Sequence, residues 1–157
     1  MPRRWIPLTG CTTIVLLAVW SVVQNLVLNP LATAPGRSLP QIHADITAAG
    51  ESMDSGLVLA VAGLGVGLAF ALLLTGRRRQ HANPRAAATG FLVLGVFAAP
   101  AHWLASFGPN IALADTYQTS GAAHSPWGWP IYLASGLCLI ALILLAHPAR
   151  EPHAATS

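Results

Sequence analysis

The chain has 157 residues, of which 54% are hydrophobic and only 8% are charged. Soluble domains carry about 25% charged residues, and a soluble domain of this size has too much surface to cover with so few charges. The composition therefore excludes a water-soluble globular domain and predicts an integral membrane protein. All eight of the Lys and Arg residues are arginine, and with the abundant alanine and glycine this indicates a GC-rich, bacterial genome.

Four apolar stretches contain no Asp, Glu, Lys or Arg, and each is longer than the ~20 residues that cross a hydrocarbon core. Because a backbone in lipid must satisfy its own hydrogen bonds, each stretch is expected to be a helix. The stretches cover residues 5–28, 55–76, 86–107 and 127–147. The predicted fold class is all-α, a polytopic integral membrane protein with a four-transmembrane-helix bundle in one membrane domain (1–157).

The first stretch is expected to end before Asn29-Pro30. Two processing signals compete with an uncleaved helix. "LTGC" at 8–11 matches a bacterial lipobox, but the apolar segment between the arginines and the cysteine is too short for a lipoprotein signal. "ATA" at 32–34 resembles a signal-peptidase site, but the apolar run before it is longer than usual and Pro35 would follow the cut. We therefore expect the first helix to stay uncleaved.

The first external loop, 29–54, contains a pattern of its own. Apolar residues recur at helical spacing within residues 38–53, Ser38 can cap the helix, and Gly50 would end it. This predicts a short amphipathic helix that lies on the outer interface or over the bundle. The apolar positions are Leu39, Ile42, Ile46, Ala49 and Met53.

The second stretch carries glycines that superficially match a dinucleotide loop. "GLGVGLAF" at 63–70 has the spacing GxGxG instead of GxGxxG and lies in mid-span with no strand before it, which excludes that interpretation. Small residues instead share one helix face, on which another helix can approach closely. A helix of the same chain is the expected partner, and another subunit is the alternative. This helix-packing face consists of Gly56, Ala60, Gly63, Gly67 and Ala71.

The arginines predict the orientation in the membrane. In a four-pass threading seven of the eight lie on one side and only Arg37 lies on the other. The positive-inside rule places both termini, loop 77–85 and tail 148–157 in the cytoplasm, in a plasma membrane. So short a loop cannot form the folded basic module that binds nucleic acid, and anionic lipid headgroups are its expected neighbours. The orientation signal comprises Arg3, Arg4, Arg77, Arg78, Arg79 and Arg85, with Arg150 in the tail.

Prolines divide the second half of the chain. Pro100 lies inside the third stretch, where it removes the hydrogen bond to the Val96 carbonyl and is expected to kink the helix near its outer end. That stretch is expected to end at Gly108-Pro109, because glycine often terminates a helix and proline cannot continue it. The second external loop, 108–126, shows no periodicity and is expected to be irregular.

No spacing in the sequence defines a catalytic or cofactor-binding site, so no cofactor is expected. Cys11 and Cys138 lie in apolar runs and belong to no CxxC motif. No two histidines lie four residues apart on a helix, the spacing that would put two ligands on one face. A Zn²⁺ or Cu²⁺ site would need the external loops to bring separate side chains together, and solvated loop histidines are the competing interpretation. The candidate ligands are His43, His102, His124 and Asp115.

Three classes of function follow. We expect a non-catalytic accessory, scaffolding or assembly component of a membrane complex. The alternatives are a small oligomeric transporter or channel, and a membrane enzyme or metal-binding protein with an external His/Asp site. Gln24 and Asn25, near the outer end of the first stretch, are expected to bond a neighbouring helix. Expected partners are the lipid bilayer and either a membrane protein or a second copy of the chain, but not nucleic acid.

Overall fold

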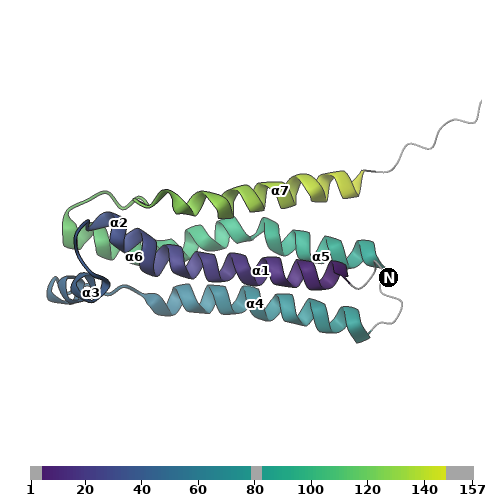
Figure 1. Ribbon diagram of the computed structural model, residues 1–157, viewed down its shortest axis with the longest axis horizontal. Helices are drawn as coiled ribbons and strands as arrows, with labels where there is room; N and C mark the ends of the chain where they lie inside the picture. Colours follow the sequence, from purple (N-terminus) through teal and green to yellow (C-terminus); the bar gives the residue numbers. More distant parts are fainter. Residues whose placement is uncertain (1–4, 79–82, 148–157) are drawn as a thin grey trace, which may run out of the picture.

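The computed structural model describes residues 5–78 and 83–147, and over these residues it contains helices and connecting turns but no strand (Figure 1). In chain order the elements are α1 (Trp5–Val23), the π-helix η2 (Gln24–Leu28), α2 (Asn29–Thr33), α3 (Leu39–Ala48), α4 (Ser55–Arg78), α5 (Pro84–Val96), α6 (Ala98–Tyr117), the 3₁₀-helix η3 (Pro126–Gly128) and α7 (Trp129–Ala146).

The predicted all-α class with membrane-spanning helices is confirmed. Four helical segments of the described chain are long and apolar enough to cross a membrane, at Trp5–Thr33, Ser55–Gly76, Pro84–Tyr117 and Pro126–Ala146. They run side by side along the long axis of the molecule (Figure 1). α3 lies at one end of the bundle, called the α3 end below, and the opposite end is where α1 begins, α4 ends and α5 begins.

Part of the predicted orientation signal lies at that opposite end. Arg77 and Arg78 end α4, and the Arg85 guanidinium on α5 donates a hydrogen bond to the Leu145 carbonyl of α7. The other arginines of the signal, Arg3, Arg4, Arg79 and Arg150, lie outside the described residues, as do parts of loop 77–85 and all of tail 148–157.

The first span does not end before Asn29-Pro30, as the sequence predicted. It continues as η2 and α2 to Thr33, with the Asn29 N–H bonded to the Gln24 carbonyl five residues earlier. In a regular α-helix the Pro30 ring would clash with the carbonyl of Leu26, and the wider π turn relieves this clash. Proline therefore widens the helix here and does not terminate it.

The third span is interrupted, as Pro100 predicts, but at Phe97, before the middle of the span and not near its outer end. α5 ends at Val96 and α6 begins at Ala98, on either side of this break. Pro100 has no N–H for the Val96 carbonyl. The Ser135 hydroxyl of α7 donates to that carbonyl instead, at 2.6 Å. A side-chain hydrogen bond between the third and fourth spans thus replaces the missing backbone bond.

We expect Ser135→Ala to lower the free energy of unfolding by about 1 kcal/mol, because it leaves the Val96 carbonyl without a partner. The measurement is thermal unfolding in detergent, made in the parent and in a Pro100→Ala background. In that background the restored N–H at position 100 can bond Val96, so the cost of losing Ser135 should shrink. An equal cost in both backgrounds would contradict this explanation of the break.

The predicted end at Gly108-Pro109 is also wrong. α6 continues through Pro109 to Tyr117, so the first half of the loop predicted as irregular is helical. The reason is packing at the α3 end, where tertiary contacts outweigh the local stop signal. The extension carries Ala112 and Leu113 into a buried apolar cluster, called the α3 cluster. Its members are Ala34, Ile42, Ile46, Met53, Ala112 and Leu113.

The predicted amphipathic helix is confirmed as α3, which packs over the bundle against α6. Its two isoleucines, Ile42 and Ile46, are buried in the α3 cluster. At its start the Ser38 N–H donates to the Gln41 side chain at 2.8 Å, and Gly50 follows its end with a φ of +82°, which glycine adopts without strain.

Among residues 5–78 and 83–147 no helix packs on the small-residue face of α4, so the partner expected within the chain is not found there. All five residues are exposed, and a Cβ added to Gly56, Gly63 or Gly67 would meet no atom within 4 Å. The close helix contacts occur elsewhere. A Cβ on Gly10 would lie 2.5 Å from Cγ of Phe91, and one on Gly95 would collide with Sγ of Cys138. The spacing of these small residues shows that they share one face of α4, but it does not show which face of the helix the bundle buries.

Candidate functional site

A polar network fills the interior of the bundle near the α3 end. Gln24, Asn25 and Asn29 of the first span are each no more than 2% exposed, although amides are costly to bury without hydrogen bonds. The π turn places them there, because it brings Asn29 one turn above Gln24 at a spacing of five residues. In a regular α-helix two residues five apart point in different directions.

Asn29 lies at the centre of this network. Its Oδ1 accepts hydrogen bonds from the backbone N–H groups of His124, at 2.7 Å, and Ser125, at 3.1 Å. Its Nδ2 donates to Oδ1 of Asn110 on α6 at 2.8 Å. One side chain thus fixes the loop before η3 and the extension of α6 to the first span.

Gln24 holds the end of the same loop at Ser125, and Trp20 holds η3 directly after it. The Gln24 amide donates to the Ser125 carbonyl at 3.3 Å and accepts from the Ser125 hydroxyl at 3.2 Å. The indole Nε1 of Trp20 donates to the Trp127 carbonyl at 2.9 Å, and the two indole rings meet edge to face. Gln24 and Asn29 therefore both bind Ser125.

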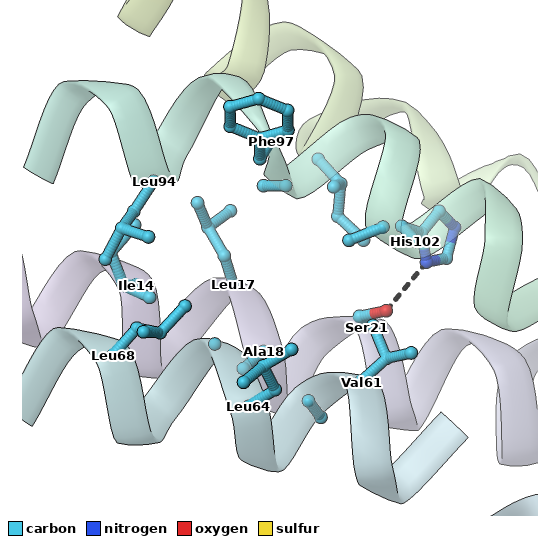
Figure 2. Close-up of a pocket in the computed structure, with 15 residues that line it drawn as sticks. Ile14, Leu17, Ala18, Ser21, Val61, Leu64, Leu68, Leu94, Phe97 and His102 are labelled. Carbon is cyan, nitrogen blue, oxygen red and sulfur yellow. Dashed lines mark hydrogen bonds between the residues drawn. The ribbon is translucent and has the colours of Figure 1, made fainter. Parts of the chain in front are cut away.

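His102 is a buried residue of α6 that joins the network through Ser21 and Asn25 of the first span. Its Nδ1 lies 2.8 Å from Oγ of Ser21 and 3.3 Å from Nδ2 of Asn25 (Figure 2). Because the Asn25 amide nitrogen can only donate, Nδ1 is the acceptor and the ring proton belongs on Nε2. The ring also packs edge to face on Tyr132 of α7. His102 is thus a neutral histidine that links three spans.

The structure does not bring the predicted metal ligands together. Among the described residues no three His, Cys, Asp or Glu side chains gather in a way that could hold a metal ion. Nδ1 of His102 is occupied by Ser21 and Asn25, whereas His124 is exposed with Nδ1 3.3 Å from the Thr33 hydroxyl. His43 and Asp115 are exposed on α3 and α6. The convergence of external side chains that a metal site would need is therefore not found among the described residues.

Sequence reasoning treated the amides of the first span as ordinary interhelical contacts and missed the network as a whole. The signal was present, since polar residues recur on successive turns at Ser21, Gln24, Asn25 and Asn29. Their partners were not visible, because Asn110 and Ser125 are far away in the chain and lie in a segment predicted as an irregular loop.

The arrangement is suited to holding segments in place. The hydrogen bonds of the network join the first span to α6, to the loop before η3 and to η3 itself. No protein-family model matches the chain, and no curated protein or solved structure is significantly similar to it.

Proposed function

We propose that the protein is a non-catalytic accessory, scaffolding or assembly component of a membrane complex, which acts by contact. The observation that carries this proposal is the exposed small-residue face of α4. In lipid, helices associate through close van der Waals packing, which glycine and alanine permit by letting two backbones approach. The partner is a transmembrane helix of another protein or of a second copy of this chain.

The polar network supports contact as the mode of action over transport. Its amides and His102 bond to one another and to backbone groups in the interior of the bundle, whereas a transport path needs polar groups that are free to meet the solute. The network and the α3 cluster together hold the α3 end in one shape. The α3 end held in this way, together with the exposed small-residue face of α4, suits a protein that holds a partner in position.

The test is photo-crosslinking in native membranes, with a photoreactive phenylalanine at Ala60 on the small-residue face. The matched control carries the same residue at Leu137, which is exposed on α7. We expect a discrete protein adduct from position 60 alone, which mass spectrometry would identify as a copy of this chain or as a different protein. Adducts with lipid only would overturn the proposal.

A second arm separates association from folding. Gly63→Leu should abolish the adduct without lowering the thermal stability of the isolated protein, since position 63 has open space around it within the chain. Gly136→Leu, in equally open space on α7, should leave the adduct intact. A loss of adduct in both variants would contradict a role specific to the α4 face.

We also propose that the protein lies in a bacterial plasma membrane with both termini in the cytoplasm. The support is the arginine asymmetry of the sequence, in which a four-pass threading puts seven arginines on one side of the membrane and Arg37 on the other. Alkaline phosphatase fused after Thr47 or Gly121 should be active, because both positions would be extracytoplasmic. Fusions after Gln80 or Ser157 should be inactive, and activity after Gln80 would reverse the orientation.

A further inference from the structure

A cavity of about 180 Å³ lies between α1, α4 and the α5–α6 junction, directly below the polar network (Figure 2). Its walls are apolar along almost their whole length, with Ile14, Leu68 and Leu94 at one end. The other end holds Ser21 and His102, joined by their hydrogen bond. The cavity is therefore amphipathic, with a long apolar body and one polar end.

The cavity opens toward the lipid-facing surface. Three of its lining side chains are largely exposed on the outside of the bundle, namely Leu64 at 65%, Leu68 at 45% and Phe97 at 61%. These large apolar residues lie within spans, so the medium they face is hydrocarbon. A ligand would therefore enter sideways from the bilayer.

The polar end selects a hydrogen-bond donor. Since Nδ1 of His102 accepts from its neighbours, the Ser21 hydroxyl donates to it and keeps its own oxygen lone pairs as acceptors. A hydroxyl group on a ligand can donate to that oxygen. Neither Ser21 nor neutral His102 supplies a formal charge that would favour an ionic headgroup.

The depth of the polar end also fits an amphiphile. Trp20 directly precedes Ser21, and Trp103 directly follows His102. Tryptophan is enriched where the headgroups meet the hydrocarbon. A hydroxyl bound at Ser21 would thus lie near the interface, with the apolar body of the ligand directed toward the bilayer centre along Ile14 and Leu68.

We propose that this cavity binds a neutral membrane lipid that carries a free hydroxyl group, with the hydroxyl on Ser21 and a ring or aliphatic chain in the apolar part. An apolar cavity of about 150 Å³ holds one benzene ring. The volume here therefore accommodates one ring or a comparable length of chain, and the rest of the lipid extends into the bilayer through the opening. The proposal is independent of the contact function of α4.

The test uses a 1-hexadecanol probe that carries a diazirine in its chain, added to the full-length protein in lipid nanodiscs. The matched probe is the same alkane without the hydroxyl. After illumination, peptide mapping should locate the label at the cavity. The alcohol should label about fivefold more strongly than the alkane, as expected for one hydrogen bond. Equal labelling by the two probes would overturn the selection of a hydroxyl.

Two sets of variants test the site itself. Gly65 lines the cavity, and a Cβ added there meets no atom within 4 Å, so Gly65→Leu should fill the space without a clash and abolish the label. Gly136→Leu, in open space on α7 and away from the cavity, should keep it. Ser21→Ala should make the two probes equal, and Ser21→Thr should restore the preference. Labelling that Gly65→Leu leaves unchanged would overturn the proposal.

Discussion

Replacing Asn29 by leucine is expected to lower the stability of the protein more than any other single change in the polar network. The substitution leaves two backbone N–H groups, those of His124 and Ser125, without an acceptor, and it leaves Asn110 without its donor. A buried polar group without a partner costs about 1–3 kcal/mol. We therefore expect a loss of about 3 kcal/mol or more in the free energy of unfolding.

The native cysteines provide the measurement. Cys11 is a free thiol buried in the bundle, so a thiol-reactive fluorophore reports thermal unfolding in detergent. Thr13→Val is the control, because the Thr13 hydroxyl is exposed and donates to the Thr9 carbonyl of its own helix. Combining Asn29→Leu with Asn110→Leu should cost less than the sum of the two single changes, because both partners of one bond are then removed. Equal unfolding temperatures for Asn29→Leu and Thr13→Val would refute the central role of Asn29.

The second large effect is expected at Gly10, where α1 meets α5. A single methyl group there would lie 2.5 Å from Cγ and 2.9 Å from Cβ of Phe91, too close to the backbone of α5 for the ring to move aside freely. Gly10→Ala should therefore destabilise the bundle by about 1–3 kcal/mol through overpacking, despite the better helix propensity of alanine.

Gly67→Ala is the matched control for this substitution, because it adds the same methyl group in mid-helix where no atom lies within 4 Å. Phe91→Leu should rescue part of the loss in the Gly10→Ala background by removing ring atoms from the contact. The measurement is the thermal unfolding of the parent, of Gly10→Ala, of Gly67→Ala and of the double variant Gly10→Ala/Phe91→Leu. If Gly10→Ala and Gly67→Ala unfold at the same temperature as the parent, the close contact of α1 with α5 is not as described.

The sequence predicted the elements that depend on composition and periodicity. Four long uncharged stretches can only be helices in lipid, and the apolar spacing around Ile42 and Ile46 can only be buried on one side of a helix. The predicted helix ends at Asn29-Pro30 and Gly108-Pro109 were wrong, because the prediction relied on proline ending a helix as it normally does in water. In this bundle the π turn relieves the clash of the Pro30 ring, and packing at the α3 end outweighs the stop signal at Gly108-Pro109. Both helices therefore continue.

The candidate site was less predictable, because it depends on contacts between distant parts of the chain. The spacing of Gly63 and Gly67 shows that they share a face, but not whether the bundle buries that face. The histidines at 43, 102 and 124 could be brought together only by particular loop conformations. The helical extension of α6 instead places Asn110 beside Asn29, a pairing that no local pattern indicates.

The π turn at Gln24–Leu28 has a consequence for the chain length that this region tolerates. A π turn accommodates one more residue than an α-helical turn between the same two ends, so Asn29 already occupies the place that a residue four after Gln24 would take. Deleting Val27 and replacing Pro30 by alanine should therefore leave Asn29 above Gln24 and preserve its bonds to the loop. The replacement is needed because the closed α-helical turn would bring the Pro30 ring against the carbonyl four residues before it. The same deletion at Val19, within regular α-helix, would turn the helix by about 100° and separate the polar face from its partners. A one-residue deletion in this span should accordingly be tolerated within the π turn at Gln24–Leu28 but not within the regular α-helix around Val19.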